Sequence, residues 1–160
     1  MNKSFISWAV YDIANTVFNM GVVGLFLPLW INHREGSTDA DLGFPVAASM
    51  VVVLVSSPFL GALTDRLKSR ILTFTVLNIA TTGSIFVIGI TENVPIILMF
   101  FSVSFVSVYL AELLYNAMLV EASTPENRGK LGGIGIGLGY TGSLVIILLA
   151  LLYGEFDPNY

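Results

Sequence analysis

Residues 44–70 read FPVAASMVVVLVSSPFLGALTDRLKSR, an apolar run followed directly by a short segment with three basic side chains. The run from 44 to 63 contains no charged residue. As a helix rising about 1.5 Å per residue, it is long enough to cross a hydrocarbon core of about 30 Å. The stretch therefore predicts a transmembrane helix that ends in a loop at the membrane surface.

The same alternation of long apolar runs and short polar segments continues along the whole chain. It is 55% hydrophobic and only 11% charged, whereas soluble domains carry about a quarter charged residues. We therefore predict an all-α membrane protein, in contact with the lipid bilayer and without a separate soluble domain. Pro28 and Pro58 are expected to kink or end their spans. The five predicted spans cover residues 6–31, 44–63, 71–90, 94–118 and 132–153.

The basic residues set the expected orientation of these spans. One side of the membrane receives six of them, namely Lys3, Arg66, Lys68, Arg70, Arg128 and Lys130. The other side receives only Arg34, together with most of the acidic residues. Cytoplasmic loops are enriched in Lys and Arg, so we predict that the N-terminus and both basic loops are cytoplasmic.

Composition also argues against several classes of function. The net charge of −4 and the lack of a basic stripe argue against a nucleic-acid partner. The chain has no cysteine, which excludes disulfides and thiolate metal sites. Its single histidine, His33, lies in a polar segment with no second histidine to share a metal. We expect no metal site and no cofactor.

The segment after the second span carries the sequence GALTDRLKSR, from Gly61 to Arg70. On composition alone it is an ordinary cytoplasmic loop. Its G-x-x-x-D-R-x-x-x-R spacing and its position resemble the signature between helices two and three of the major facilitator superfamily (MFS), although Lys68 stands where that signature usually has glycine. The resemblance implies a cytoplasmic gate that is latched by these residues, partly against the second half of the transporter: Gly61, Asp65, Arg66 and Arg70.

Two further stretches resemble one branch of this superfamily. They are SWAVYDIAN at 7–15 and YNAMLVEASTPENRGKLGG at 115–133, which continues to Leu138-Gly139-Tyr140. The branch contains the vacuolar amino-acid effluxers of autophagy and their bacterial relatives. The resemblance implies a bacterial cytoplasmic-membrane transporter that moves a small metabolite, with amino acids as candidates, by alternating access. Glu121 and Arg128 would then be boundary residues of the cytoplasmic gate.

Superfamily members have about twelve helices in two six-helix halves. Five spans correspond to an incomplete N-terminal half, so residues 1–160 are interpreted as part of a six-helix bundle. The expected partner is the missing C-terminal half. Two alternatives stay open: a truncated fragment of a transporter, or a non-transporting membrane subunit that assembles with a separate partner half.

Two carboxylates lie inside predicted spans, Asp12 in the first and Glu112 in the fourth. Each is six residues, or roughly 9 Å, from the expected cytoplasmic boundary. A charge in lipid is costly, so such groups face a cavity, pair or take a proton; alternatively each hydrogen bonds a neighbour. In the superfamily, helices one and four line the central cavity. We predict a substrate- or proton-binding site formed by Asp12, Asn15, Asn19, Glu112, Tyr115 and Asn116.

An enzyme is the main rival from another class. Tyr11-Asp12 matches the first half of the intramembrane aspartyl protease motif. Such enzymes need two opposed aspartates, and no aspartate follows the glycine run of the fifth span. We therefore expect that the chain is not an enzyme.

The fifth span is unusually rich in glycine. Gly137-x-Gly139-x-x-Gly142 has the letters of a dinucleotide-binding fingerprint, but that fingerprint requires a preceding strand and a polar phosphate site. Small residues spaced four apart instead allow membrane helices to approach closely. We predict helix packing through Gly133 with Gly137, and through Gly135 with Gly139.

The predicted orientation can be tested by cysteine labelling, because the chain has no cysteine of its own. In intact cells, cysteines that replace Ser69 and Asn127 should be protected from a membrane-impermeant thiol reagent. A cysteine that replaces Ser37 should react. Labelling of the Ser69 variant without labelling of the Ser37 variant would show that the orientation is inverted.

Overall fold

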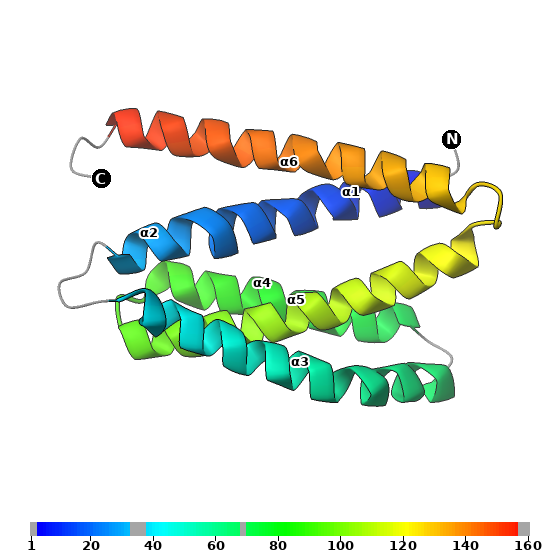
Figure 1. Cartoon of the computed structure of the whole chain (residues 1–160), viewed down its shortest axis with the longest axis horizontal. Coiled ribbons are helices and arrows are strands. Elements are labelled where there is room, and N and C mark those ends of the chain that lie inside the picture. Colours follow the sequence, from blue (N-terminus) through cyan, green and yellow to red (C-terminus); the bar gives the residue numbers. More distant parts are fainter. Residues whose placement is uncertain (1–2, 33–37, 68–69, 157–160) are drawn as a thin grey trace. The chain divides into compact units, whose positions relative to one another are not determined.

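The computed structural model describes the backbone of residues 3–32, 38–67 and 70–156. It describes their side chains except those of residues 3–9, 39, 67, 121, 122 and 153–156. All elements of this part are helices: α1 (Lys3–Val17), η1 (Phe18–Phe26), α2 (Leu27–Asn32), α3 (Asp39–Leu67), α4 (Arg70–Ile90), α5 (Val94–Ala122) and α6 (Arg128–Phe156) (Figure 1). They form two compact units, which are described separately.

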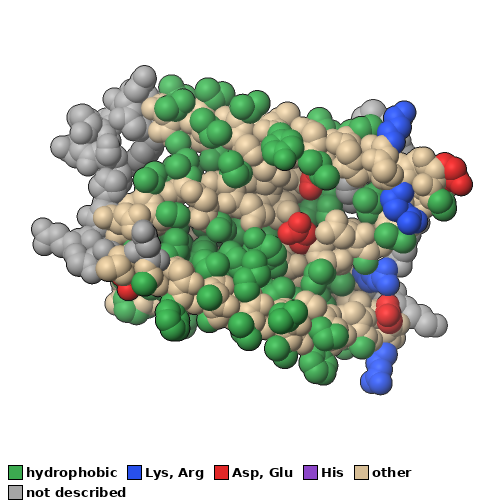
Figure 2. Space-filling model, viewed as in Figure 1, with side chains coloured by type: hydrophobic (Ala, Val, Ile, Leu, Met, Phe, Trp, Pro, Cys, Tyr) green, Lys and Arg blue, Asp and Glu red, His purple; other side chains and the backbone are tan. Residues whose placement is uncertain are grey.

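The predicted fold class is confirmed. Among the described residues, five helical stretches are long and apolar enough to cross a membrane: Val10–Asn32, Ala40–Arg66, Arg70–Ile90, Val94–Val120 and Arg128–Leu152. The first is assembled from α1, η1 and α2 in succession. Green hydrophobic side chains run along the helices in Figure 2, whereas the blue Lys and Arg side chains lie at helix ends.

Unit 2 comprises Thr38–Ala122 and holds α3, α4 and α5. Side-chain caps set where its helices begin. Before α3, the carboxylate of Asp41 accepts hydrogen bonds from the backbone N–H of Thr38 (2.7 Å) and from its hydroxyl (3.2 Å). Before α5, the side-chain oxygen of Asn93 accepts from the N–H of Ile96 at 3.2 Å.

Proline does not end the second span. Helix α3 contains both Pro45 and Pro58 and continues to Leu67. Each proline removes one backbone donor from the helix, a loss that neighbouring groups often compensate inside membranes. The hydroxyl of Ser57, the residue before Pro58, donates to the carbonyl of Val53, whereas the carbonyl that loses its α-helical donor is that of Leu54. Of the two alternatives predicted for Pro58, termination of the span is therefore ruled out.

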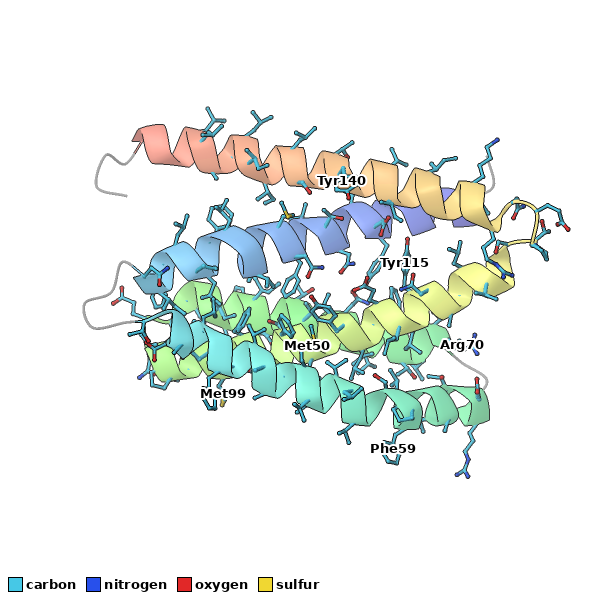
Figure 3. The ribbon with its side chains drawn as sticks, in the orientation of Figure 1. Met50, Phe59, Arg70, Met99, Tyr115 and Tyr140 are labelled. Carbon is cyan, nitrogen blue, oxygen red and sulfur yellow. The ribbon has the colours of Figure 1, made fainter. Side chains whose placement is uncertain are left out.

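Within unit 2, α5 packs against both α3 and α4. Several small hydroxyl side chains are buried on these helices, which favours close approach of their backbones. They are Ser49 and Thr64 on α3, Thr81 and Ser84 on α4, and Ser104 and Ser107 on α5. Large apolar side chains point outward, as a lipid-facing surface requires; Phe59 is 71% exposed and points away from α4 and α5 (Figure 3).

Unit 1 comprises residues 1–37 and 123–160, and in it α6 packs along α1 and η1. The closest approach is at Gly142, where an added Cβ would lie 2.7 Å from the carbonyl oxygen of Ile13. Farther along, a Cβ on Gly21 of η1 would lie 3.2 Å from Cδ1 of Ile146. Glycine at these positions therefore allows the two helix backbones to touch.

The glycines of α6 divide between two faces. Gly135, Gly139 and Gly142 are buried, and the last two contact α1. Gly133 and Gly137 are exposed, and no described atom lies within 4 Å of a Cβ built on either. Gly142, which belongs to neither predicted pair, makes the tightest contact. The packing predicted through Gly133 with Gly137 is not seen within the described part of the chain.

The first span changes from α-helical to π-helical geometry at Phe18 and returns to α-helical geometry at Leu27. Pro28 lies in the first turn of α2. A proline ring clashes with the carbonyl four residues earlier, which is that of Gly24. A wider π-helical turn just before the proline relieves this clash. The predicted effect of Pro28 is therefore seen as a change of helical geometry, and the span continues to Asn32.

The close contact at Gly142 predicts a selective effect of added methyl groups. Gly142→Ala should destabilise the chain by about 1–3 kcal/mol, because the new Cβ would meet the backbone of Ile13. Gly137→Ala is the matched control on the open face, where alanine should be neutral or slightly stabilising. Thermal unfolding in detergent micelles measures both. Equal effects of the two substitutions would contradict this packing.

Candidate cytoplasmic gate and membrane carboxylates

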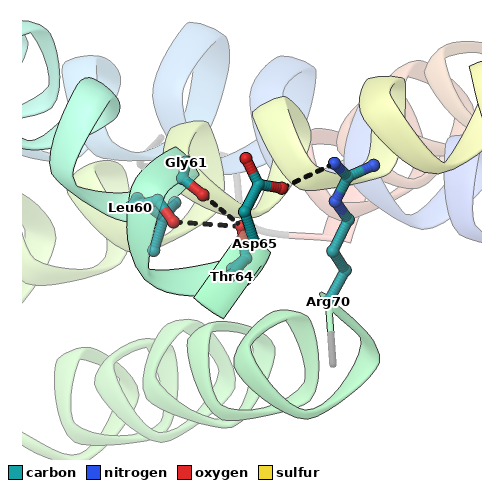
Figure 4. A network of polar contacts seen from close by, with 5 residues as sticks. All are labelled: Leu60, Gly61, Thr64, Asp65 and Arg70. Carbon is teal, nitrogen blue, oxygen red and sulfur yellow. Dashed lines mark hydrogen bonds and ion pairs between the residues drawn. The ribbon is translucent and has the colours of Figure 1, made fainter. Parts of the chain in front are cut away.

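The predicted gate segment spans the end of α3 and the beginning of α4. Nη2 of Arg70 lies 3.0 Å from Oδ1 of Asp65, which forms an ion pair between the two helices (Figure 4). The Asp65 side chain is 67% exposed and that of Arg70 is 27% exposed. An ion pair this open to solvent contributes little, about 0–1 kcal/mol. It can therefore orient the helix ends without locking them.

Helix dipoles explain why these two residues pair with each other. Asp65 lies at the C-terminal end of α3, where the helix carries partial negative charge. Arg70 lies at the N-terminal end of α4, where the partial charge is positive. Each side chain is unfavourably placed in its own helix, and the ion pair offsets both costs. Arg66, in contrast, suits the last turn of α3 and is exposed.

One turn before the ion pair, α3 presents a buried hydroxyl and an open glycine. The Thr64 hydroxyl is 2% exposed and lies 3.0 Å from the carbonyl oxygens of both Leu60 and Gly61. No described atom comes within 4 Å of a Cβ built on Gly61. Gly61 therefore leaves an open notch in α3, one turn before Asp65.

Asp12 lies on α1 beside α6. A Cβ built on Gly139 would lie 3.5 Å from Oδ2 of Asp12 and 2.8 Å from Oγ1 of Thr16. The Thr16 hydroxyl donates to the carbonyl of Asp12 at 2.8 Å. Gly139 therefore leaves room for the Thr16 hydroxyl, and the carboxyl group of Asp12 lies beside this contact between α1 and α6.

The asparagines that follow Asp12 hydrogen bond to each other. Nδ2 of Asn19 lies 3.0 Å from the carbonyl oxygen of Asn15 and 3.3 Å from its Oδ1. Both side chains are half-buried. They are thus held in one row along α1, with the side-chain oxygen of Asn19 left as an acceptor.

Glu112 lies on α5 beyond a row of aromatic rings. The ring centroids of Phe101 and Phe105 are 5.6 Å apart, and those of Phe105 and Tyr109 are 4.6 Å apart. Glu112 follows three residues after Tyr109 and is half-buried. Of the other two predicted site residues on α5, Tyr115 is buried and Asn116 is exposed.

A tight turn at residues 123–127 precedes α6. The carbonyl of Thr124 accepts from the N–H groups of Asn127 (3.1 Å) and Arg128 (3.0 Å). Nε of Arg128 donates to the hydroxyl oxygen of Ser123 at 3.1 Å. The backbone N–H of Glu126 and then the Thr124 hydroxyl hold the pKa of the Glu126 carboxyl below its usual value. The side chain of Glu121 lies outside the described residues.

The predicted site residues therefore fall into groups within each unit. Unit 1 brings Asp12 close to Gly139 and joins Asn15 to Asn19. Unit 2 joins Asp65 to Arg70 and carries Glu112. The expectation that Asp12 and Glu112 share one cavity stays a prediction.

The chain shows distant sequence similarity to known proteins. It is 30% identical over 156 residues to the uncharacterised MFS-type transporter YxiO of Bacillus subtilis (strain 168), an alignment that covers 91% of this chain and 36% of that transporter. It is 27% identical over 144 residues to an uncharacterised protein of Aquifex aeolicus (strain VF5), covering 89% of this chain and 37% of that protein. This chain thus spans little more than a third of either relative. No protein-family model and no solved structure matches it.

The dipole argument predicts the outcome of exchanging the paired charges. The double variant D65R/R70D should be at least as stable as the unmodified chain, because each charge then suits its helix end by about 0.3–1 kcal/mol. The single variants D65R and R70D each place like charges together, so each should be less stable than the unmodified chain. The sum of their two losses should exceed the change in stability of the double variant. Chemical unfolding of the four proteins in mixed micelles gives the coupling energy, expected at about 0.2–1 kcal/mol. A coupling energy of zero would show that the ion pair contributes nothing.

Proposed function

We propose that this chain belongs to the N-terminal half of a major facilitator superfamily transporter that moves a small metabolite by alternating access. The observation that carries the proposal is the similarity to an MFS-type transporter over 91% of the chain. It is supported by five helices able to cross a membrane, and by an ion pair within the segment that resembles the superfamily's gate signature.

In the proposed mechanism, Asp12 and Glu112 bind a proton or a cationic group of the solute. Both carboxylates lie within candidate membrane spans, Asp12 two residues from the Val10 end and Glu112 eight residues from the Val120 end. Asn15, Asn19, Tyr115 and Asn116 offer hydrogen bonds to the solute. Because Asp12 lies against Gly139, a change in its charge acts directly on the contact between α1 and α6. This contact provides a route from proton binding to helix movement.

The cytoplasmic gate in this proposal consists of Asp65, Arg66 and Arg70, with Gly61 as the contact surface for another helix. A gate must open and close in every cycle, so its interactions have to be weak enough to exchange. The solvent-exposed Asp65–Arg70 pair meets this requirement. The notch at Gly61 has room for a helix of the C-terminal half. Glu121 and Arg128 belong to the same boundary region in this proposal.

The finer parts of the proposal concern substrate and location. The resemblance of residues 7–15 and 115–133 to the vacuolar amino-acid effluxer branch favours amino acids as the solute. The two bacterial relatives favour the bacterial cytoplasmic membrane. The positions of the basic residues favour a cytoplasmic N-terminus. The expected partner is the C-terminal half of the transporter, and alternating access requires both halves.

Transport itself is testable with the complete protein in proteoliposomes. We expect accumulation of at least one labelled solute from a panel of amino acids and other small metabolites, driven by an imposed proton gradient or by counterflow. Protein-free liposomes are the control. If no solute is taken up under either driving force, the transport proposal is wrong, and assembly as a non-transporting subunit becomes the better explanation.

The two carboxylates should control how transport depends on pH. Asp12→Asn and Glu112→Gln replace a titratable group by an amide that cannot exchange a proton, so either change should abolish transport or flatten its pH profile. Arg66→Ala should slow turnover and keep the profile, because Arg66 is assigned to the gate. Flux between about pH 5 and 8 distinguishes these outcomes. Wild-type flux and profile in both carboxylate variants would mean that the acids are structural.

A further inference from the structure

The π-helical segment η1 leaves one backbone carbonyl without its usual donor. At the end of this segment the N–H of Leu27 donates to the carbonyl of Val22, five residues earlier. In an α-helix this N–H would bind the carbonyl of Val23 instead. The π-helical donor for Val23 would be residue 28, which is proline and has no N–H. Both helical donors of the Val23 carbonyl are therefore missing.

This carbonyl lies deep within the first span. Val23 is thirteen residues from Val10 and nine from Asn32, the ends of that span. Nine residues correspond to at most about 14 Å, close to half of a hydrocarbon core of about 30 Å. Within unit 1, no described side chain hydrogen bonds to the Val23 carbonyl.

A bare carbonyl at this depth needs a polar partner. Leaving a polar group without a hydrogen bond in hydrocarbon costs several kcal/mol. For this reason, irregular backbone in membrane proteins is found where it is buried in protein or lines a hydrated pathway. Gly24, the next residue, is exposed and has no side chain to cover the carbonyl. The carbonyl is therefore not shielded by the side chain of the residue that follows it.

The chemistry of the site selects the class of solute. A backbone carbonyl without a helical donor keeps its lone pairs available and favours cations and N–H donors. Hard metal ions such as Ca²⁺ need six or more oxygen ligands, which one carbonyl does not provide. A primary ammonium group has three donors and can give one of them to a single acceptor.

We infer that the carbonyl oxygen of Val23 accepts a hydrogen bond from a primary ammonium group of the transported solute near the middle of the first span. The inference rests on the proposed transport function and names the solute class. It also links two points on one helix, because the carboxylate of Asp12 lies eleven residues away, about three turns. A cationic amine would meet the carboxylate of Asp12 at one level of the first span and the carbonyl of Val23 at another.

The sequence allows this one carbonyl to be observed directly. Val23–Gly24 is the single Val–Gly pair of the chain, and Met20–Gly21 is the single Met–Gly pair. Labelling with carbonyl-¹³C valine and ¹⁵N glycine therefore gives one carbon–nitrogen-correlated NMR signal, that of the Val23 carbonyl. Labelled methionine reports Met20 in the same way. Met20 lies in the same π-helical segment and is the matched control.

The experiment titrates the labelled chain in lipid nanodiscs with methylammonium, and in parallel with tetramethylammonium, which has the same charge but no N–H donor. We expect methylammonium to shift the Val23 carbonyl signal and to leave the Met20 signal in place. Tetramethylammonium should shift neither. No response to methylammonium, or an equal response to both cations, overturns the inference.

A proline substitution supplies an independent test. Pro28→Ala restores a backbone N–H, so the Val23 carbonyl should gain a helical donor and lose its response to methylammonium. Pro58→Ala makes the same change in α3 and should leave the response intact. A full response in the Pro28 variant would overturn the inference. Solute flux in proteoliposomes tests the transport proposal separately, so the two can fail independently.

Discussion

The whole structure depends on one constraint, that backbone N–H and C=O groups inside a hydrocarbon layer must hydrogen bond within the protein. Helices meet this constraint within each segment, and every element of the described chain is helical. Polar side chains in the spans follow the same rule by donating to carbonyls of their own helix, four residues earlier. Examples are Thr16, Ser57, Thr75, Asn78, Thr81 and Ser102. The Val23 carbonyl has no helical donor and so departs from this rule, which is why we propose a functional role for it.

Because lipid is as apolar as leucine, the hydrophobic effect does not hold these helices together. Close contact of small residues takes its place, in two different forms. In unit 1, Gly139 and Gly142 bring α6 against the backbone of α1. In unit 2, buried serine and threonine side chains lie on α3, α4 and α5. The large apolar side chains are left to face outward, as those of Phe59 and Met99 do.

Charge is distributed according to what each location permits. Basic side chains lie at helix ends, and the Asp65–Arg70 pair joins two such ends where solvent keeps it weak. Asp12 and Glu112 lie within spans instead, where an ionised group is costly. The Asp12 carboxylate lies beside Gly139, so the same close packing that holds α1 to α6 also brings a carboxyl group next to the contact. The contact between α1 and α6 therefore includes a residue, Asp12, to which we also assign a role in transport.

The sequence by itself determined the number, order and type of the spans, because run length and hydrophobicity report directly on transfer into lipid. It also determined that basic residues mark the helix ends, and it identified the acids inside the spans. Tertiary structure decided which glycines pack: the i, i+4 spacing is met equally by Gly133 with Gly137 and by Gly135 with Gly139, and only the neighbouring helix distinguishes them. It also decided that Asp12 lies against α6, and that Pro28 follows a π-helical segment. These features depend on the approach of one backbone to another, which a pattern along a single chain does not specify.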